Sequence, residues 1–238
     1  MYNIAVIGAS GAIGGALTEH LAYLHPGAML TAFSRSHTTF ADPRINSRIL
    51  DYENETEIAS AAVLASESGP LDLVIVASGL LHDDETMPEK SLRDLSGEKF
   101  LKLFNVNTVT PAIVAKHFIP RLNTDTPAIF AALSARVGSI SDNQLGGWYA
   151  YRASKAALNM VIKNLAIEAA RRNKGATIVG LHPGTVDSAL SKPFQSNVPD
   201  GKLFTPNDAA EKLCHVLTHL SPSQSGLCFG WDGQEIKP

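Results

Sequence analysis

"YNIAVIGASGAIG", residues 2–14, is the stretch that decides the fold. Residues 2–7 form a short run of β-forming residues that leads into glycines at positions 8, 11 and 14, and residues 12–24 predict a helix. In a strand-to-helix turn, one glycine permits the tight turn, a second lets the backbone approach a pyrophosphate, and a third lets the helix pack on the sheet. The stretch therefore predicts a dinucleotide-binding loop whose helix N-terminus holds phosphates, the alternative being an ordinary glycine-rich turn.

Strand-like and helix-like segments alternate along the rest of the chain. Further strands are predicted at 29–34, 47–50, 71–78, 128–134, 176–182 and 226–231, and further helices at 53–67, 98–122, 148–172 and 208–220. Apolar strands separated by helices indicate a parallel sheet that is covered on both faces. Because no repeat, low-complexity segment or linker interrupts the pattern, one domain over residues 1–238 is predicted.

Composition excludes several classes of function. The chain has 238 residues and a net charge of −3, so no basic surface for nucleic acid is expected. Cys214 and Cys228 are too few for a disulfide framework, which favours a reduced, cytoplasmic setting. The N-terminus does not resemble a signal peptide, and no apolar run approaches the ~20 residues that span a bilayer. Without a spanning segment, no membrane partner is expected. The histidines lack metal-ligand spacing, so no metal is expected.

The end of the second predicted strand indicates which cofactor is bound. An NAD-binding site normally places an acid there for the ribose hydroxyls, but this chain has Arg35. A guanidinium can bind a 2′-phosphate, so NADP(H) is favoured and NAD(H) is less expected, unless Arg35 is simply a surface residue. Asp51 and Tyr52 follow the third strand and are predicted to border the adenine. The alternative for Asp51 is an acid that leads the next helix.

A tyrosine–lysine pair lies in "GGWYAYRASKAALNM", residues 146–160. Tyr151 and Lys155 are four residues apart and share a helix face, whereas Tyr149 and Lys155 are six apart and do not. A nearby ammonium is expected to lower the pKa of a phenol from about 10 toward the working pH. Such a phenol exchanges a proton with a carbonyl or alcohol while hydride moves to or from a nicotinamide. By spacing alone, the pair also suits a purely structural role.

These motifs resemble the short-chain dehydrogenase/reductase family. The resemblance rests on Gly8, Gly11 and Gly14, on Asn107 in "NVN", on "YRASK" at 151–155 and on "HPGTVDS" at 182–188. The segment 146–160 and "WDG" at 231–233 resemble the C-factor and sniffer-type carbonyl reductase branch most. The resemblance implies a single Rossmann-type doubly wound α/β domain with a seven-stranded parallel sheet. It also implies NADP(H)-dependent interconversion of a small-molecule carbonyl and an alcohol.

The resemblance also implies roles for individual residues. Tyr151 would be the general acid/base, Lys155 its activator and a ligand of the nicotinamide ribose, and Asn107 the holder of a water in a proton relay. Pro183, Gly184 and the backbone of Val186 would line the nicotinamide, with Ser188 near its carboxamide. Together with the residues argued above, the predicted cofactor contacts are Gly8, Ser10, Gly11, Ile13, Gly14, Arg35, Asp51, Tyr52, Ala77, Gly79, Lys155, Pro183, Gly184, Val186 and Ser188.

The chain departs from the family pattern at several places, among them Ile7 and Ala12 in the glycine loop, and two departures bear on the site. Val76 and Ala77 replace a pair of asparagines, and Ala135 stands where the family serine that binds the substrate carbonyl is found. Ser134 is the nearest serine and is the predicted catalytic one, although in an extended strand it points to the opposite face. Ser139 is the alternative. These departures motivate a second hypothesis, a non-catalytic nucleotide-binding or signalling protein on the same fold.

Two further segments carry expectations. Residues 187–206 are predicted to form a lid, with Phe194 and Phe204 closing over an apolar substrate, or else an irregular surface excursion. Residues 100–119 and 150–170 are apolar nearly all round, as helices buried on two sides are. A homodimer or homotetramer through these helices is therefore expected, as the resemblance also implies.

Overall fold

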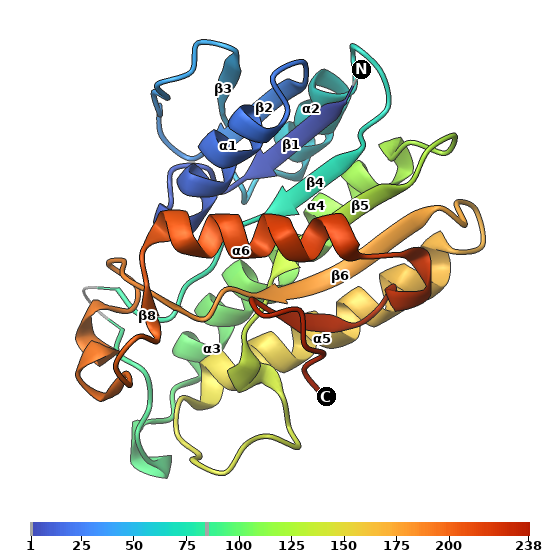
Figure 1. Ribbon diagram of the computed structural model, residues 1–238. Helices are drawn as coiled ribbons and strands as arrows, with labels where there is room; N and C mark the ends of the chain where they lie inside the picture. The colour runs from blue at the N-terminus through green and yellow to red at the C-terminus, as the bar shows by residue number, and fades with distance from the viewer. Residues whose placement is uncertain (1, 84–85) are drawn as a thin grey trace.

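The computed structural model describes residues 2–83 and 86–238 and is built around a parallel sheet of seven strands in the order β3-β2-β1-β4-β5-β6-β9 (Figure 1). The strands are β1 (Asn3–Ile7), β2 (Met29–Ser34), β3 (Ile45–Ile49), β4 (Leu73–Val76), β5 (Ala128–Leu133), β6 (Ala176–His182) and β9 (Cys228–Gly230). Each lies within about two residues of its predicted position, the usual uncertainty at element ends. The predicted α/β fold with a seven-stranded parallel sheet is confirmed.

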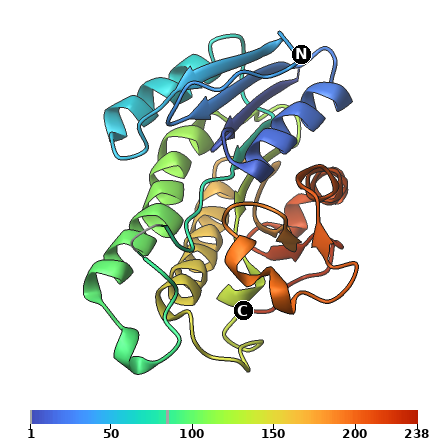
Figure 2. The same cartoon turned by 90° about the vertical axis from the view of Figure 1, so that its left-hand side faces the viewer.

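Helices cover both faces of the sheet. On one face, α1 (Ala12–Leu24) packs beside α6 (Pro206–His219). The other face carries α2 (Glu55–Ala65), α4 (Thr110–Phe118) and α5 (Tyr149–Ala169), and Figure 2 shows the two layers on opposite sides of the strands. The sheet is therefore doubly wound, because the chain crosses from one face to the other between strands.

The predicted helix over 98–122 consists of several pieces. It comprises α3 (Gly97–Phe104), a π-helical turn at Asn105–Val109, α4, and a 3₁₀ turn at Ile119–Arg121. Pro111 explains the break, since proline has no N–H and its ring excludes the carbonyl four residues earlier from the helical ladder. That carbonyl belongs to Asn107, so the helix is distorted where a functional residue is predicted.

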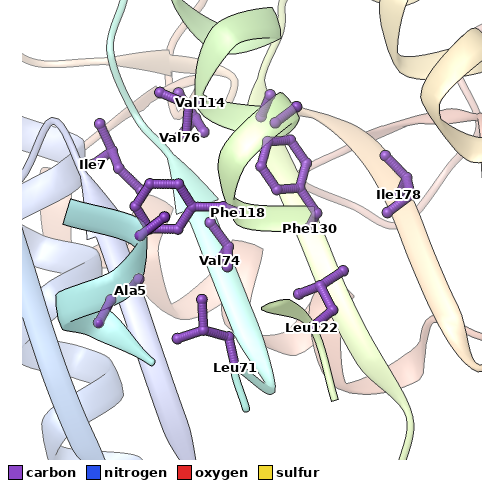
Figure 3. Packing of buried hydrophobic residues seen from close by; sticks show 14 of the residues in the cluster. Ala5, Ile7, Leu71, Val74, Val76, Val114, Phe118, Leu122, Phe130 and Ile178 are labelled. Carbon is purple, nitrogen blue, oxygen red and sulfur yellow. The ribbon is translucent and has the colours of Figure 1, made fainter. Parts of the chain in front are cut away.

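The central strands are buried on both faces, as their continuous apolar sequences predict. Side chains alternate along β1, so Ala5 and Ile7 face the α2–α4–α5 layer while Ile4 and Val6 face the α1–α6 layer. In Figure 3 the ring of Phe118, from the end of α4, lies against Ile7 and the side chains of β4. Each large side chain buried in this way contributes about 1.5–3 kcal/mol.

Because all seven strands run the same way, their carboxyl ends meet at one edge of the sheet. The glycine-containing loop after β1 and the loops after β4, β5 and β6 therefore gather there, at the point where the chain order reverses beside β1. A two-stranded parallel ribbon, β7 (Thr185–Val186) with β8 (Leu203–Phe204), connects the segment after β6 with the start of α6. Between β7 and β8 lies a 3₁₀ segment, Lys192–Asn197.

Among the described residues, no helix is both long and apolar enough to cross a membrane.

Candidate active site

The loop after β1 is shaped by glycines. Gly8 has a φ of +93°, and a Cβ placed on it would lie 2.7 Å from the backbone nitrogen of Ser78. A Cβ on Gly14 would overlap the carbonyl oxygen of Gly8. Helix α1 can therefore approach the loop closely only because these two positions carry no side chain. Gly11 precedes the helix and provides no side-chain cap. The first backbone N–H groups of α1 therefore face the loop without a side-chain acceptor and can bind an anion.

Tyr52 and Asp51 lie beside this loop. The Tyr52 hydroxyl donates a hydrogen bond of 3.1 Å to Phe33 O, the same carbonyl that accepts from the backbone N–H groups of Gly8 and Ala9. Burial raises the pKa of Tyr52 to about 12. The Asp51 carboxylate accepts from the backbone nitrogen of Glu53 at 2.9 Å, within the turn that leads to α2. Tyr52 thus supports the glycine loop, and Asp51 shapes the approach to the helix.

A cavity of about 260 Å³ lies at the carboxyl edge of the sheet, beneath the segment that follows β7. It brings together residues from the loops after β1, β4, β5 and β6 and from the first turns of α5. Of the predicted site residues, those that line it are Ile13, Ala77, Gly79, Ser134, Tyr151, Lys155, Pro183, Gly184, Val186 and Ser188. Arg35 is exposed after β2 and shares a separate hollow with Gly79.

Tyr151 and Lys155 lie one turn apart at the start of α5, and both are buried. The Lys155 Nζ is 5.9 Å from the centroid of the Tyr151 ring and donates a hydrogen bond of 2.8 Å to Leu133 O. Burial raises the pKa of Tyr151 to about 12 and lowers that of Lys155 to about 8. The expected lowering of the tyrosine pKa by the lysine is therefore wrong for this structure, because desolvation of the phenolate dominates.

Asn107 is buried in the π-helical turn and connects two elements of the site. Its Oδ1 accepts from Leu80 N at 2.8 Å, and its Nδ2 donates to Leu80 O at 2.8 Å and to Ser154 Oγ at 3.0 Å. The side chain therefore fixes the loop after β4 against α5. With both amide hydrogens used in this way, its predicted part in a proton relay stays a prediction.

The serines near β5 are engaged with protein groups. The Ser134 hydroxyl donates to Asn159 Oδ1 at 2.6 Å, so its single proton is committed to α5 although the residue lines the cavity. Ser139 Oγ accepts from Asp142 N at 3.1 Å, in the loop that follows. Ala135 lines the cavity where the resemblance expects a hydroxyl. The hydrogen bond from Ser134 to Asn159 joins residues 25 positions apart, so no local sequence pattern predicted it.

Two residues that sequence reasoning missed fix the start of α5. Trp148 has a φ of +49°, the only positive value for a non-glycine residue in the described chain, and its N–H donates to Glu89 O at 2.6 Å. The buried Glu89 carboxylate accepts from Ala150 N at 3.3 Å. Gly146 and Gly147 precede the tryptophan and also have positive φ values. This glycine pair was the signal in the sequence that the backbone here is not extended or helical in the ordinary way.

Aromatic side chains from the start of α5 and from the predicted lid segment, residues 187–206, form one wall of the cavity. Trp148 contacts Phe194 edge-to-face at 4.9 Å and Tyr151 at 6.2 Å between ring centroids. The His82 ring nitrogen lies 3.0 Å from Leu190 O, which connects the lid segment to the loop after β4. Phe204 instead packs against Trp231 at 4.8 Å, behind Gly184. Of the two phenylalanines expected to cover a substrate, Phe194 lines the cavity and Phe204 supports its floor.

Within residues 2–83 and 86–238, no group of three or more histidine, cysteine or acidic residues is placed to hold a metal ion.

The chain is similar in sequence to a known protein family and to two proteins described below. A sequence model described as short chain dehydrogenase matches residues 2–199. The chain is 31% identical over 169 residues to a protein named C-signal from Myxococcus xanthus, covering 71% of this chain and 93% of the other. It is also 31% identical over 185 residues to 1-hydroxy-2-glutathionyl-2-methyl-3-butene dehydrogenase from Rhodococcus sp. (strain AD45), covering 77% and 76%.

Two solved structures share the fold over almost all of both chains. One is the carbonyl reductase Sniffer of D. melanogaster, with a TM-score of 0.86, 21% identity and 100% of each chain covered. The other is an NADPH-bound carbonyl reductase from chicken fatty liver, with a TM-score of 0.83 and 22% identity, covering 99% of this chain and 93% of that one. At these identities the likeness concerns the fold.

Proposed function

The chain belongs to the short-chain dehydrogenase family and is an oxidoreductase; from this premise we propose that it interconverts a carbonyl and an alcohol with NADP(H), using Tyr151 as general acid/base. The observation that carries the proposal is the position of Tyr151. It lies in a cavity at the carboxyl edge of the sheet, one helical turn from Lys155 and next to a loop that can cradle a pyrophosphate.

The residues around the loop fit a dinucleotide. Side chains at Gly8 and Gly14 would fill the cradle, and the uncapped N–H groups of α1 suit a pyrophosphate. Arg35 stands after β2, where a 2′-phosphate would bind. The chicken carbonyl reductase is described as NADPH-bound, and a related Burkholderia multivorans protein as carrying NADP, which supports this choice. When bound, the nicotinamide supplies or accepts the hydride.

The protonation states of the pair suit reduction. With a pKa of about 12, Tyr151 keeps its proton at neutral pH and can donate it to a carbonyl oxygen as negative charge develops there. Lys155, with a pKa of about 8, is mostly charged at pH 7. One of its three N–H groups is used by Leu133 O, so two remain for a cofactor ribose and for stabilising the phenolate left on Tyr151.

The cavity wall indicates the class of substrate. Apart from the tyrosine–lysine pair, the wall is largely apolar, and no carboxylate or guanidinium group is among the described residues that line it. Its large apolar members are Leu81, Val137, Trp148, Leu190, Phe194 and Val198. An ionised substrate would lose hydration against this wall, and the one charged group in it, Lys155, is assigned in this proposal to the cofactor ribose and the Tyr151 phenolate. We therefore propose an uncharged aldehyde or ketone with an apolar or aromatic group.

The test is titration with NADPH followed by a panel of carbonyl compounds, monitored at the absorbance of the reduced nicotinamide. Tyr151→Phe keeps the ring and removes the acidic proton, so kcat should fall by roughly 10²–10⁴-fold, while the Kd for NADPH stays unchanged. Tyr149→Phe is the matched control, because Tyr149 lies outside the cavity and its loss should leave turnover intact. Normal turnover by Tyr151→Phe contradicts the proposal.

The alternative function is a non-catalytic nucleotide-binding or signalling protein. It is favoured by one observation: Ala135 lines the cavity in place of a hydroxyl, and Ser134 donates its proton to Asn159. The same titration separates the two. Tight NADPH binding without turnover of any carbonyl on the panel is the result expected of the alternative.

A further inference from the structure

Two buried side-chain atoms in the described residues have no hydrogen-bond partner: Ser78 Oγ and His182 Nδ1. Such atoms are uncommon in folded proteins and mark places where a ligand or a special protonation state is accommodated. Both residues line the cavity. Ser78 lies against Gly8, on the side of the glycine loop, whereas His182 lies at the end of β6, directly before Pro183.

The strand geometry places the His182 side chain on the side of Tyr151. Side chains two apart in a strand face the same way. A Cβ on Gly180 would lie 3.3 Å from Ile162 Cδ1, so that face of β6 looks toward α5. His182, two residues further, faces α5 as well, where Tyr151 and Lys155 project.

The environment of the ring fixes which nitrogen carries the proton. A buried N–H without an acceptor is rarer in proteins than a buried acceptor without a donor. Since Nδ1 is shut off from solvent and has no partner, the proton belongs on Nε2. A doubly protonated ring would again need an acceptor at Nδ1. Burial, reinforced by Arg136 and opposed by Asp232, lowers the pKa of His182 to about 4, so the ring is neutral at working pH.

We propose that His182, as the neutral Nε2–H tautomer, donates to the substrate carbonyl oxygen the hydrogen bond that Ala135 cannot give. This inference rests on the proposed function. The substrate oxygen is then held between the Tyr151 hydroxyl and the His182 N–H, and both donors are uncharged before reaction. A neutral donor suits a cavity whose wall is apolar, because it imposes no buried charge when the site is empty of substrate.

The kinetic test compares three variants with the wild type. His182→Phe keeps a ring but removes both nitrogens, and kcat/KM for the carbonyl should fall by roughly 10²–10³-fold, as for loss of one preorganised donor. His182→Asn retains an N–H donor and should recover part of the loss. His215→Phe makes the same substitution at an exposed position on α6, outside the cavity, and should leave turnover unchanged. The Kd for NADPH and the Tm, measured on each variant, identify any variant that fails to fold.

A spectroscopic test reads the tautomer without turnover. Two-bond ¹⁵N–¹H correlation spectra of the histidines, with His182→Phe to assign the signal, should show Nε2 protonated and Nδ1 bare from pH 6 to 8. A protonated Nδ1, or full activity of His182→Phe, overturns the inference while Tyr151→Phe still reports on the proposed function. A wild-type protein that binds NADPH but reduces nothing contradicts the proposed function itself, and the inference with it.

Discussion

Lys155 is a cation enclosed beneath the cavity, and its burial makes the stability of the fold depend on pH. Its pKa is lowered from 10.5 to about 8 by desolvation. Below about pH 8 the amine is charged in both the folded and the unfolded states, so the full cost of burying the charge is present. Between about pH 8 and 10.5 the folded state loses the proton first, and this cost disappears as pH rises.

Lys155→Met should therefore change the pH dependence of the Tm. The Tm of the variant minus that of the wild type is expected to decrease by roughly 5–10 °C between pH 7 and pH 10, since the shift felt over this range is nearly two pKa units, one unit corresponds to about 1.4 kcal/mol and each kcal/mol to about 2–4 °C. Thermal unfolding followed by circular dichroism at several pH values measures it. Lys174→Met, at an exposed position, is the control. A difference that is constant with pH contradicts the buried cation.

Arg35 sets the predicted choice of cofactor. The wild type should bind NADPH more tightly than NADH, and Arg35→Asp should reverse the preference by about 1–3 kcal/mol, the range of a charge-assisted hydrogen bond. Fluorescence titration with both nucleotides measures the two Kd values. Arg93→Asp makes the same charge change at an exposed site in the 3₁₀ turn Leu92–Asp94 and should leave the preference unchanged. Equal affinities of the unmodified protein for the two nucleotides contradict the assignment.

For single residues, the sequence predicted the relative positions of side chains that are close along the chain. The four-residue spacing of Tyr151 and Lys155 was enough to place both on one face of a helix and in one cavity. It was not enough for the pKa of Tyr151, which depends on burial by surrounding elements. The sequence also could not predict that His182 Nδ1 is buried without a hydrogen-bond partner, because this depends on how the folded chain packs around the ring.

At the scale of elements, helix α5 begins without a cap from its own sequence. Trp148, in the left-handed conformation, precedes it without a side-chain cap, and Glu89 from the loop after β4 accepts from the N–H of Ala150. A carboxylate also interacts favourably with the positive end of the helix dipole. Tyr151, the proposed general acid/base, lies one residue beyond Ala150, so the cap fixes the backbone that positions it.

Glu89→Ala should destabilise the protein by roughly 0.5–2 kcal/mol, the usual range for loss of a helix cap, and lower the Tm by several degrees. Glu89→Gln keeps an acceptor oxygen and should lose less. Differential scanning calorimetry measures both, with Glu67→Ala at an exposed position as the control. An unchanged Tm for Glu89→Ala contradicts a stabilising contribution from this cap.

Elements with strong periodicity were the predictable ones. All seven strands of the main sheet were predicted, most of them from apolar runs, but the π-helical turn at Asn105–Val109 was not. Pro111 was a visible signal of a break. What the sequence did not show is that the Asn107 side chain holds the distorted turn against Leu80, 27 residues away.

At the scale of the whole molecule, the side of the sheet bearing α3 and α5 retains exposed apolar side chains. Leu101 and Met160 are 75% and 62% exposed, and Ile167 is also exposed. In Figure 2 the green and yellow helices that carry them run side by side. This surface motivates the predicted homodimer or homotetramer, since large exposed apolar patches mark interaction sites.

Met160→Glu should convert the assembly into monomers, because it introduces a charge into the predicted interface. Multi-angle light scattering at micromolar concentration gives the mass of the wild type and the variant. Tyr23→Glu, at an exposed position on α1, should leave the mass unchanged. A monomeric wild type contradicts the prediction.

Strand order lies beyond what periodicity can supply. The alternation of strands and helices predicted a parallel sheet, but the order β3-β2-β1-β4-β5-β6-β9 depends on which crossovers pack together, and the family resemblance supplied the seven-stranded architecture. The single domain over 1–238, the cytoplasmic location and the absence of a nucleic-acid partner stay predictions.

The positions of the two tryptophans give the protein a natural optical reporter. Trp148 stands in the wall of the cavity against Phe194, and Trp231 lies behind Gly184, edge-to-face with Phe204 and close to two lysine ammonium groups. The chain has no other indole. Indole emission overlaps the absorption band of a reduced nicotinamide, so NADPH bound at the proposed site would quench the intrinsic fluorescence by energy transfer. Occupancy of the site can thus be followed by light, without a label and without a substrate.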